Sequence, residues 1–85
     1  MPDVKVAISD QFLDAFSEVP RSKQKKVRRF MTKFRRDPTL PGINYEKIEG
    51  AKDPKLRSVR IDQSYRGIVM KPDEGSVYML LWVDQ

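Results

Sequence analysis

The residues best suited to do chemistry fall in one stretch, residues 56–71, which carries arginines, a tyrosine and flanking lysines. A guanidinium group is planar and offers parallel N–H donors, so it binds a phosphate group through two hydrogen bonds. Arg60 and Arg66 are therefore candidates to contact phosphate groups. The alternative is that both arginines form ion pairs across a sheet with nearby carboxylates, namely Asp62, Glu46 and Glu49.

Other cations and aromatic rings near this stretch extend the predicted binding surface. The additional basic candidates are Lys47, Lys52, Lys55 and Arg57. Tyr45 and Tyr65 lie near predicted turns and beside cations, which makes both rings candidates to stack on nucleic-acid bases. Trp82 lies within an apolar segment and is predicted to belong to the core.

Composition narrows the chemistry further. The chain of 85 residues has the size of one domain, and 17 Lys and Arg against 12 Asp and Glu give a net charge of +5, which suits a polyanionic partner. Because the sequence has no cysteine and no histidine, it excludes disulfides, thiolate metal sites and the usual general base. We predict no metal and no cofactor.

The longest apolar run, Met79–Val83, is too short to cross a membrane, and the N-terminus lacks the pattern of a signal peptide. A soluble, cytoplasmic protein is expected.

The first half of the chain predicts a strand followed by two helices. Residues 4–8 alternate apolar and polar side chains, the pattern of a half-buried strand. A helix is expected over 10–18, because apolar residues recur there at helical spacing and Pro20 disfavours helix just before it. Ser22 is the predicted cap of a second helix, which ends at Asp37. The apolar stripe of this helix consists of Val27, Phe30, Met31 and Phe34.

Basic side chains cover the opposite side of the second helix. By helical phase they are Lys25, Arg28, Arg29, Lys33 and Arg36. Two interpretations stay open for this surface. It is a solvated helix face, or it contacts phosphate groups, in which case binding weakens steeply with salt.

The second half of the chain predicts four strands. A short strand is expected over 45–49, and residues 56–71 contain two more strands around a polar turn. Residues 72–75 have the composition of a tight turn, and the last strand spans 76–84. Both faces of that strand are apolar, which is typical of a central strand with other elements packed on each side. The prediction is an α+β domain in which an N-terminal strand and a helical hairpin precede an antiparallel β-meander.

This order of elements, together with three short motifs, resembles the RelE/ParE superfamily of toxin–antitoxin modules. The motifs Glu46–Gly50, Leu56–Ile61 and Tyr65–Val69 resemble the family's hydrophobic-x-Gly turn, arginine-bearing strand and Tyr-Arg strand. The segments Pro41–Asn44 and Arg57–Gln63 are also similar to a RelE-like domain fused before some UvrD-type helicases. The best-known members of the superfamily cut mRNA on the ribosome or poison DNA gyrase.

The resemblance implies a sheet surface on which Lys and Arg side chains grip RNA. Arg66 falls on the family's strand arginine and Arg60 on an arginine of the preceding strand, and the lysines named above lie where that branch keeps lysines. Cleavage through the RNA 2′-hydroxyl needs a base, a group that stabilises the charged phosphorane and an acid. Glu46 is the candidate base, the two arginines are the stabilising groups, and Tyr65 or Lys47 is the candidate acid of a metal-independent endoribonuclease.

Two departures separate the sequence from the RNA-cutting branch. The turn at 62–64 is longer than the family's usual Gly-Asp turn. The sequence also ends at Gln85, without the further segment that carries a basic or histidine residue and a tyrosine in those members. We therefore expect RNA or ribosome binding more than cutting from residues 1–85. The alternatives are a non-catalytic nucleic-acid-binding or interaction module associated with a UvrD-type helicase, and a ParE-like toxin that acts on gyrase. The resemblance implies an antitoxin peptide or a helicase domain as the protein partner. No interaction with a membrane is expected.

Overall fold

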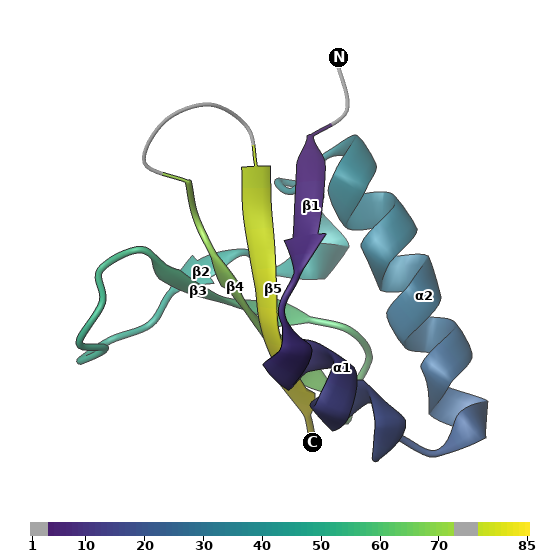
Figure 1. The fold of residues 1–85 in the computed structure, drawn as a ribbon. Coiled ribbons are helices and arrows are strands. Elements are labelled where there is room, and N and C mark those ends of the chain that lie inside the picture. Colours follow the sequence, from purple (N-terminus) through teal and green to yellow (C-terminus); the bar gives the residue numbers. More distant parts are fainter. Residues whose placement is uncertain (1–3, 73–76) are drawn as a thin grey trace.

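The structure of the chain is a computed structural model that describes residues 4–72 and 77–85 (Figure 1). Residues 73–75 of the predicted turn, and Ser76 of the predicted last strand, lie outside the described residues. In the described part, no helix is long and apolar enough to cross a membrane. The elements in chain order are β1 (Lys5–Ile8), α1 (Asp10–Ser17), α2 (Arg21–Arg36), the short 3-10 turn η1 (Pro41–Ile43), β2 (Glu46–Lys47), β3 (Leu56–Arg60), β4 (Arg66–Met70) and β5 (Val77–Asp84).

Both helices begin where backbone N–H groups find acceptors. At the start of α1, the Ser9 hydroxyl accepts a hydrogen bond from the Phe12 N–H at 3.1 Å, which is the geometry of an N-cap. The prediction that Ser22 caps α2 is wrong, because Pro20 holds the N-cap position. The carbonyl oxygen of Pro20 accepts the Gln24 N–H at 3.0 Å, and the proline ring fixes φ at a value close to that of a helix.

One side chain joins the two helices. The Gln24 amide donates hydrogen bonds to the carbonyl oxygens of Phe16 at 3.4 Å and Val19 at 3.0 Å. These carbonyls belong to the end of α1 and to the link that follows it, where acceptors otherwise lack a helical partner. The predicted helical hairpin is therefore confirmed, with α1 ending one residue earlier than expected.

The strands form one five-stranded sheet in the order β1-β5-β4-β3-β2. β3, β4 and β5 are antiparallel neighbours, which confirms the predicted meander, and β1 lies parallel to β5. Both helices lie on the same side of this sheet (Figure 1). The predicted α+β class is confirmed, although β2 is shorter than the strand expected over 45–49.

The core lies between the helices and the sheet. Three members of the predicted α2 stripe, Val27, Phe30 and Phe34, are buried, and Met31 packs against them partly exposed. The sheet supplies the facing side chains, with Val59 and Val69 each 1% exposed. The helices thus cover the central part of one face of the sheet.

The other face of β5 stays open within the described structure. β5 is central in the sheet, as predicted, but Val77, Met79 and Trp82 are 49%, 39% and 43% exposed. The prediction that elements pack on both faces of this strand is therefore wrong for the described residues. The prediction that Trp82 belongs to the core is wrong as well.

A register shift between β4 and β5 explains the position of Trp82. Ile68 of β4 pairs with Trp82, while the next residue, Val69, pairs with Leu80. Leu81 is skipped, as in a β-bulge, and the alternation of side chains along β5 reverses at that point. Leu80 therefore faces the helices, and Trp82 faces outward.

Candidate nucleic-acid interface

Arg60 and Arg66 lie side by side on the face of the sheet that carries no helix. Arg60 ends β3 and is the cross-strand partner of Arg66, which begins β4. The neighbouring Val59 is buried toward the helices, so the alternation of a strand places Arg60 on the opposite face. Both arginines are exposed. We call the side of the sheet that carries no helix the open face. Arg60 and Arg66, the two arginines that are candidates from the sequence to bind phosphate, both lie on it.

A small polar cavity of about 230 Å³ opens beside these arginines. Its polar side chains are Asn44, Glu46, Ser58, Arg60 and Arg66. Glu46 of β2 pairs with Ser58 of β3, so both side chains share the open face. Asn44 ends the η1 turn with a φ of 50°, a left-handed conformation that asparagine adopts more readily than most residues, and the chain enters β2 from there.

Arg60 and Arg66 form no ion pair with a carboxylate among the described residues. Both ion pairs found there involve Asp62, whose Oδ2 lies 3.2 Å from Lys23 Nζ and 3.6 Å from Lys26 Nζ. The alternative in which the two arginines pair with neighbouring carboxylates is therefore wrong. Like charges placed directly opposite one another destabilise a sheet, and a bound anion would relieve that repulsion.

Asp62 organises the turn between β3 and β4. Its Oδ1 accepts hydrogen bonds from the N–H groups of Ser64 and Tyr65, both at 2.7 Å. Burial acts to raise the pKa of Asp62, but these hydrogen bonds and the Lys23 ammonium outweigh burial and lower the pKa. The charged carboxylate thus holds the turn and ties it to α2.

The two tyrosines predicted to stack on bases differ in how deeply their rings are buried. Tyr65 is 6% exposed and belongs to the core, on the face opposite Arg66, so its prediction as a base-stacking ring is wrong. Tyr45 is half-buried, with its ring centre 6.3 Å from those of Phe34 and Tyr78. Burial, reinforced by Tyr78, raises the pKa of the Tyr45 hydroxyl, which is buried without a hydrogen-bond partner.

Arg57 and Lys47 lie on the side of the sheet that carries the helices. They are cross-strand partners, and Arg57 is two residues from the buried Val59 on the same strand. The Arg57 guanidinium donates to the carbonyl oxygens of Pro54 and Leu56 at 2.7 and 2.9 Å. It also lies 5.9 Å from the centre of the Tyr45 ring, within cation–π range. The structure therefore separates these two cations from Arg60 and Arg66.

The remaining predicted lysines lie on the loop between β2 and β3, which extends away from the helices (Figure 1). Lys52 is exposed, Lys55 is half-buried, and neither lines the polar cavity. Sequence reasoning missed Asn44 and Ser58, which do line it. Ser58 stands two residues before Arg60, so strand alternation alone could have placed it on the same face.

The cavity offers some of the groups that phosphoryl chemistry needs. The arginines can bind and neutralise a phosphate, and Glu46 can accept a proton. The lining contains no tyrosine, histidine or lysine to protonate a leaving group. Across residues 4–72 and 77–85, no group of three or more Asp, Glu, His or Cys side chains is placed to hold a metal ion.

Comparison with known proteins finds similarity in structure and none in sequence. No protein-family model matches the chain, and no curated protein does. The toxin–antitoxin complex RelBE2 from Mycobacterium tuberculosis matches with a TM-score of 0.82 and 19% identity, over 100% of this chain and 93% of that one. The archaeal RelE–RelB complex from Pyrococcus horikoshii OT3 matches with a TM-score of 0.76 and 22% identity, over 99% and 94% of the two chains.

A third match extends the comparison to another toxin type. The YoeB dimer from Staphylococcus aureus superposes with a TM-score of 0.71 and 17% identity, covering 98% of this chain and 97% of that one. At such identities the likeness establishes the fold, while function has to be argued from the site itself. The strand order, the helical hairpin on one face and these superpositions agree, and the chain has the fold of the RelE/ParE toxin superfamily.

Proposed function

We propose that the open face binds RNA, with phosphate groups held by Arg60 and Arg66, and that the chain acts as a RelE-like domain of the toxin family. The observation that carries this proposal is the direct cross-strand pairing of two exposed arginines, neither of which forms an ion pair with a described carboxylate. Phosphate oxygens are the acceptors that a guanidinium fork fits best. RNA is therefore the proposed ligand of this surface, whether or not the protein cleaves it.

Within this proposal, binding is favoured over cutting. The polar cavity supplies Glu46 as a base and two arginines to stabilise the phosphorane. Tyr65, the candidate acid, is buried on the other side of the sheet, and Lys47 lies on that side as well. This favours a second candidate function, a nucleic-acid-binding module without catalysis, of the kind that resembles helicase-associated RelE-like domains.

An antitoxin is the proposed protein partner. Two of the similar structures, RelBE2 from Mycobacterium tuberculosis and DinJ–YafQ from Escherichia coli, are toxin–antitoxin complexes. The net charge of +5 favours an acidic partner of this kind. Co-expression with the products of neighbouring genes, followed by co-purification, tests this part.

The RNA proposal is tested by fluorescence anisotropy with a short labelled single-stranded RNA. Arg60→Gln with Arg66→Gln should lower the affinity about a hundredfold or more, since each charge-assisted hydrogen bond contributes about 1.5–3 kcal/mol and the double variant loses at least two of them. The slope of log affinity against log salt should also become shallower by about 1.4, or 0.7 for each lost phosphate contact. Trp82, the single tryptophan, faces the same side of the sheet and offers a second signal.

A matched control removes the same charge from elsewhere. Arg28→Gln with Arg35→Gln takes two exposed arginines off α2 that line none of the cavities described in this structure. This control should bind RNA within about threefold of the wild type, a difference below 1 kcal/mol. An equal loss in both double variants would show that only net charge matters and would contradict a site at Arg60 and Arg66. Incubation with RNA in EDTA should leave the strand intact, and cleavage that Glu46→Gln abolishes would overturn the preference for binding.

A further inference from the structure

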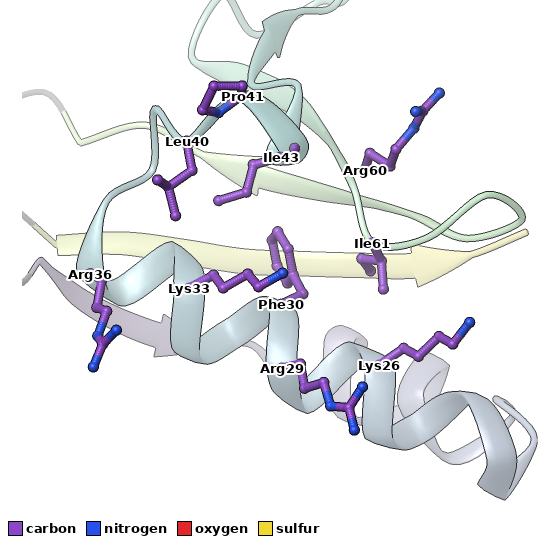
Figure 2. Close-up of a pocket in the computed structure, with 11 residues that line it drawn as sticks. Lys26, Arg29, Phe30, Lys33, Arg36, Leu40, Pro41, Ile43, Arg60 and Ile61 are labelled. Carbon is purple, nitrogen blue, oxygen red and sulfur yellow. The ribbon is translucent and has the colours of Figure 1, made fainter.

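A second and larger cavity lies on the other side of Arg60, between α2 and the η1 turn. It has a volume of about 600 Å³, within the range of small-molecule sites in proteins. Figure 2 shows its arrangement, with the apolar side chains of Leu40, Ile43 and Phe30 pointing into the space between the helix and the turn. Figure 2 shows Lys33 reaching along this floor next to Phe30, while the guanidinium groups of Arg29 and Arg36 extend from α2 away from the turn. The basic side chains that border the cavity are Lys26, Arg29, Lys33, Arg36 and Arg60. We call it the α2 cleft.

The cations of the α2 cleft are almost entirely unneutralised. The residues that line it include no aspartate and no glutamate. Of these five cations, only Lys26 forms an ion pair with a described residue, and its distance of 3.6 Å from Asp62 is long. Arg29, Lys33 and Arg36 are spaced by four and three residues, so they stand next to one another on the helix surface. Like charges at these spacings destabilise a helix, which makes the cluster a cost for the free protein.

An apolar floor bordered by cations favours a ligand that has both an anionic part and an apolar part. A simple anion would use the cations and leave Leu40, Ile43 and Phe30 without a partner. A nucleotide has both parts, phosphates for the cations and a flat, largely apolar base for the floor. The planar guanidinium groups of Arg29, Arg36 and Arg60 suit phosphates better than a lysine does. We propose that the α2 cleft binds a nucleotide, with its phosphates at the basic rim and its base against the apolar floor.

The nucleotide has two sources, a free nucleoside polyphosphate or one unit of an RNA strand. Arg60 lines both the α2 cleft and the polar cavity of the open face. An RNA strand that runs from the cleft to the open face would therefore stay next to basic side chains along the way. Only this RNA source rests on the proposed function. A free nucleotide would occupy the cleft whether or not the open face binds RNA.

The test compares two double variants of the same helix. Arg29→Gln with Lys33→Gln changes the cleft, while Lys25→Gln with Arg28→Gln removes the same two residue types from exposed positions that line neither cavity. Binding of ATP and of inorganic triphosphate, both in EDTA, is measured by calorimetry, and binding of labelled single-stranded RNA by anisotropy. The cleft variant should lose about tenfold or more in affinity for whichever nucleotide source binds. The Lys25 and Arg28 control should stay near the wild type.

The outcomes separate the sources and the failures. Tighter binding of ATP than of inorganic triphosphate, lost in the cleft variant, supports a free nucleotide. RNA binding that falls in the cleft variant, with weak binding of ATP, supports the strand. Equal affinities for ATP and inorganic triphosphate would overturn the role of the apolar floor. The same conclusion would follow if polyglutamate displaced labelled RNA as well as unlabelled RNA does. Arg66 lines only the open-face cavity. If Arg66→Gln loses RNA binding while the cleft variant changes the binding of neither RNA nor ATP, this inference is refuted and the proposed function still stands.

Discussion

Removal of the Asp62 side chain should destabilise the protein more than any other change at its charged residues. Asp62 lies in the turn between β3 and β4, and its carboxylate accepts two backbone hydrogen bonds at 2.7 Å and pairs with Lys23 and Lys26 on α2. Its side chain is only 10% exposed. Asp62→Ala leaves the N–H groups of Ser64 and Tyr65 without this acceptor and breaks the tie between the turn and the helix.

The size of the effect follows from the exposure of each partner. The two backbone hydrogen bonds end on a charged, mostly buried oxygen and dominate, at about 1.5–3 kcal/mol for a charged acceptor. The Lys23 and Lys26 side chains are 35% and 48% exposed, so solvent screens both pairs and each adds at most about 0.2–1 kcal/mol. Taking about 1.5–3 kcal/mol for the two backbone hydrogen bonds together, because water can replace the acceptor at the exposed Ser64, and adding both ion pairs, Asp62→Ala should lower the free energy of unfolding by about 2–5 kcal/mol. Asp62→Asn keeps an acceptor oxygen and should cost about 1 kcal/mol.

Urea denaturation at two pH values tests this reasoning. The pKa of Asp62 is lowered in the folded protein, so its charge contributes stability above the unfolded pKa of about 3.9. That contribution begins to fall as the pH drops below about 3.9 and is lost as the pH falls through the folded pKa, so the difference between wild type and Asp62→Asn should be smaller in acid than at neutral pH. A cost of Asp62→Ala below about 0.5 kcal/mol, the usual scale of a surface change, would refute the tether. A difference from Asp62→Asn that persists unchanged in acid would refute the role of the charge.

Three further substitutions test the packing on either side of the sheet. Gly67→Ala should cost about 1–3 kcal/mol in urea denaturation, because its new Cβ would lie 3.1 Å from a Val59 methyl group and 3.3 Å from the Trp82 carbonyl oxygen; an unchanged midpoint would mean that β3 and β5 yield freely there. Phe34→Ala, at a position that is 0% exposed, should cost about 3–5 kcal/mol. Trp82→Ser should cost less than about 1.5 kcal/mol, because much of that ring is already in water, and equal costs at the two positions would contradict an outward-facing Trp82.

The helices and the meander were predictable because local signals decide them. The stripe of Val27, Phe30 and Phe34 repeats at helical spacing, and Pro20 marks a boundary between helices whichever fold surrounds it. The face on which Trp82 lies was not predictable. Both sets of alternating residues in β5 are apolar, so the pattern gives no preference, and the skipped residue Leu81 reverses the alternation partway. A register shift depends on the neighbouring strand, which no local pattern reveals.

The candidate site was predicted in part for the same reason. Arg60 and Arg66 flank a hairpin turn, so their proximity follows from short-range pairing that the sequence indicates. Asn44 joins them only through the pairing of β2 with β3. Tyr65 precedes Arg66 on the chain, and strand alternation places adjacent residues on opposite faces. The Tyr-Arg motif therefore cannot present both side chains to one ligand.

The distribution of positive charge leads to one more prediction. Arg60 faces Arg66 across two strands, and Arg29, Lys33 and Arg36 stand together on α2, so repulsion destabilises the free protein by a few tenths of a kcal/mol for each pair. Cations that served only solubility could be spread over exposed positions without this cost.

Salt screens exposed like charges, while the carboxylate that attracts lysines, Asp62, is mostly buried and screened less. Added sodium chloride should therefore raise the melting temperature while it weakens RNA binding. In Arg29→Gln with Lys33→Gln, the rise in melting temperature should be smaller than in the control with Arg28→Gln and Arg35→Gln, which removes only one pair of like charges at these spacings. A melting temperature that falls with salt would show that attraction outweighs repulsion at these side chains, and it would remove the argument that a bound polyanion offsets their cost.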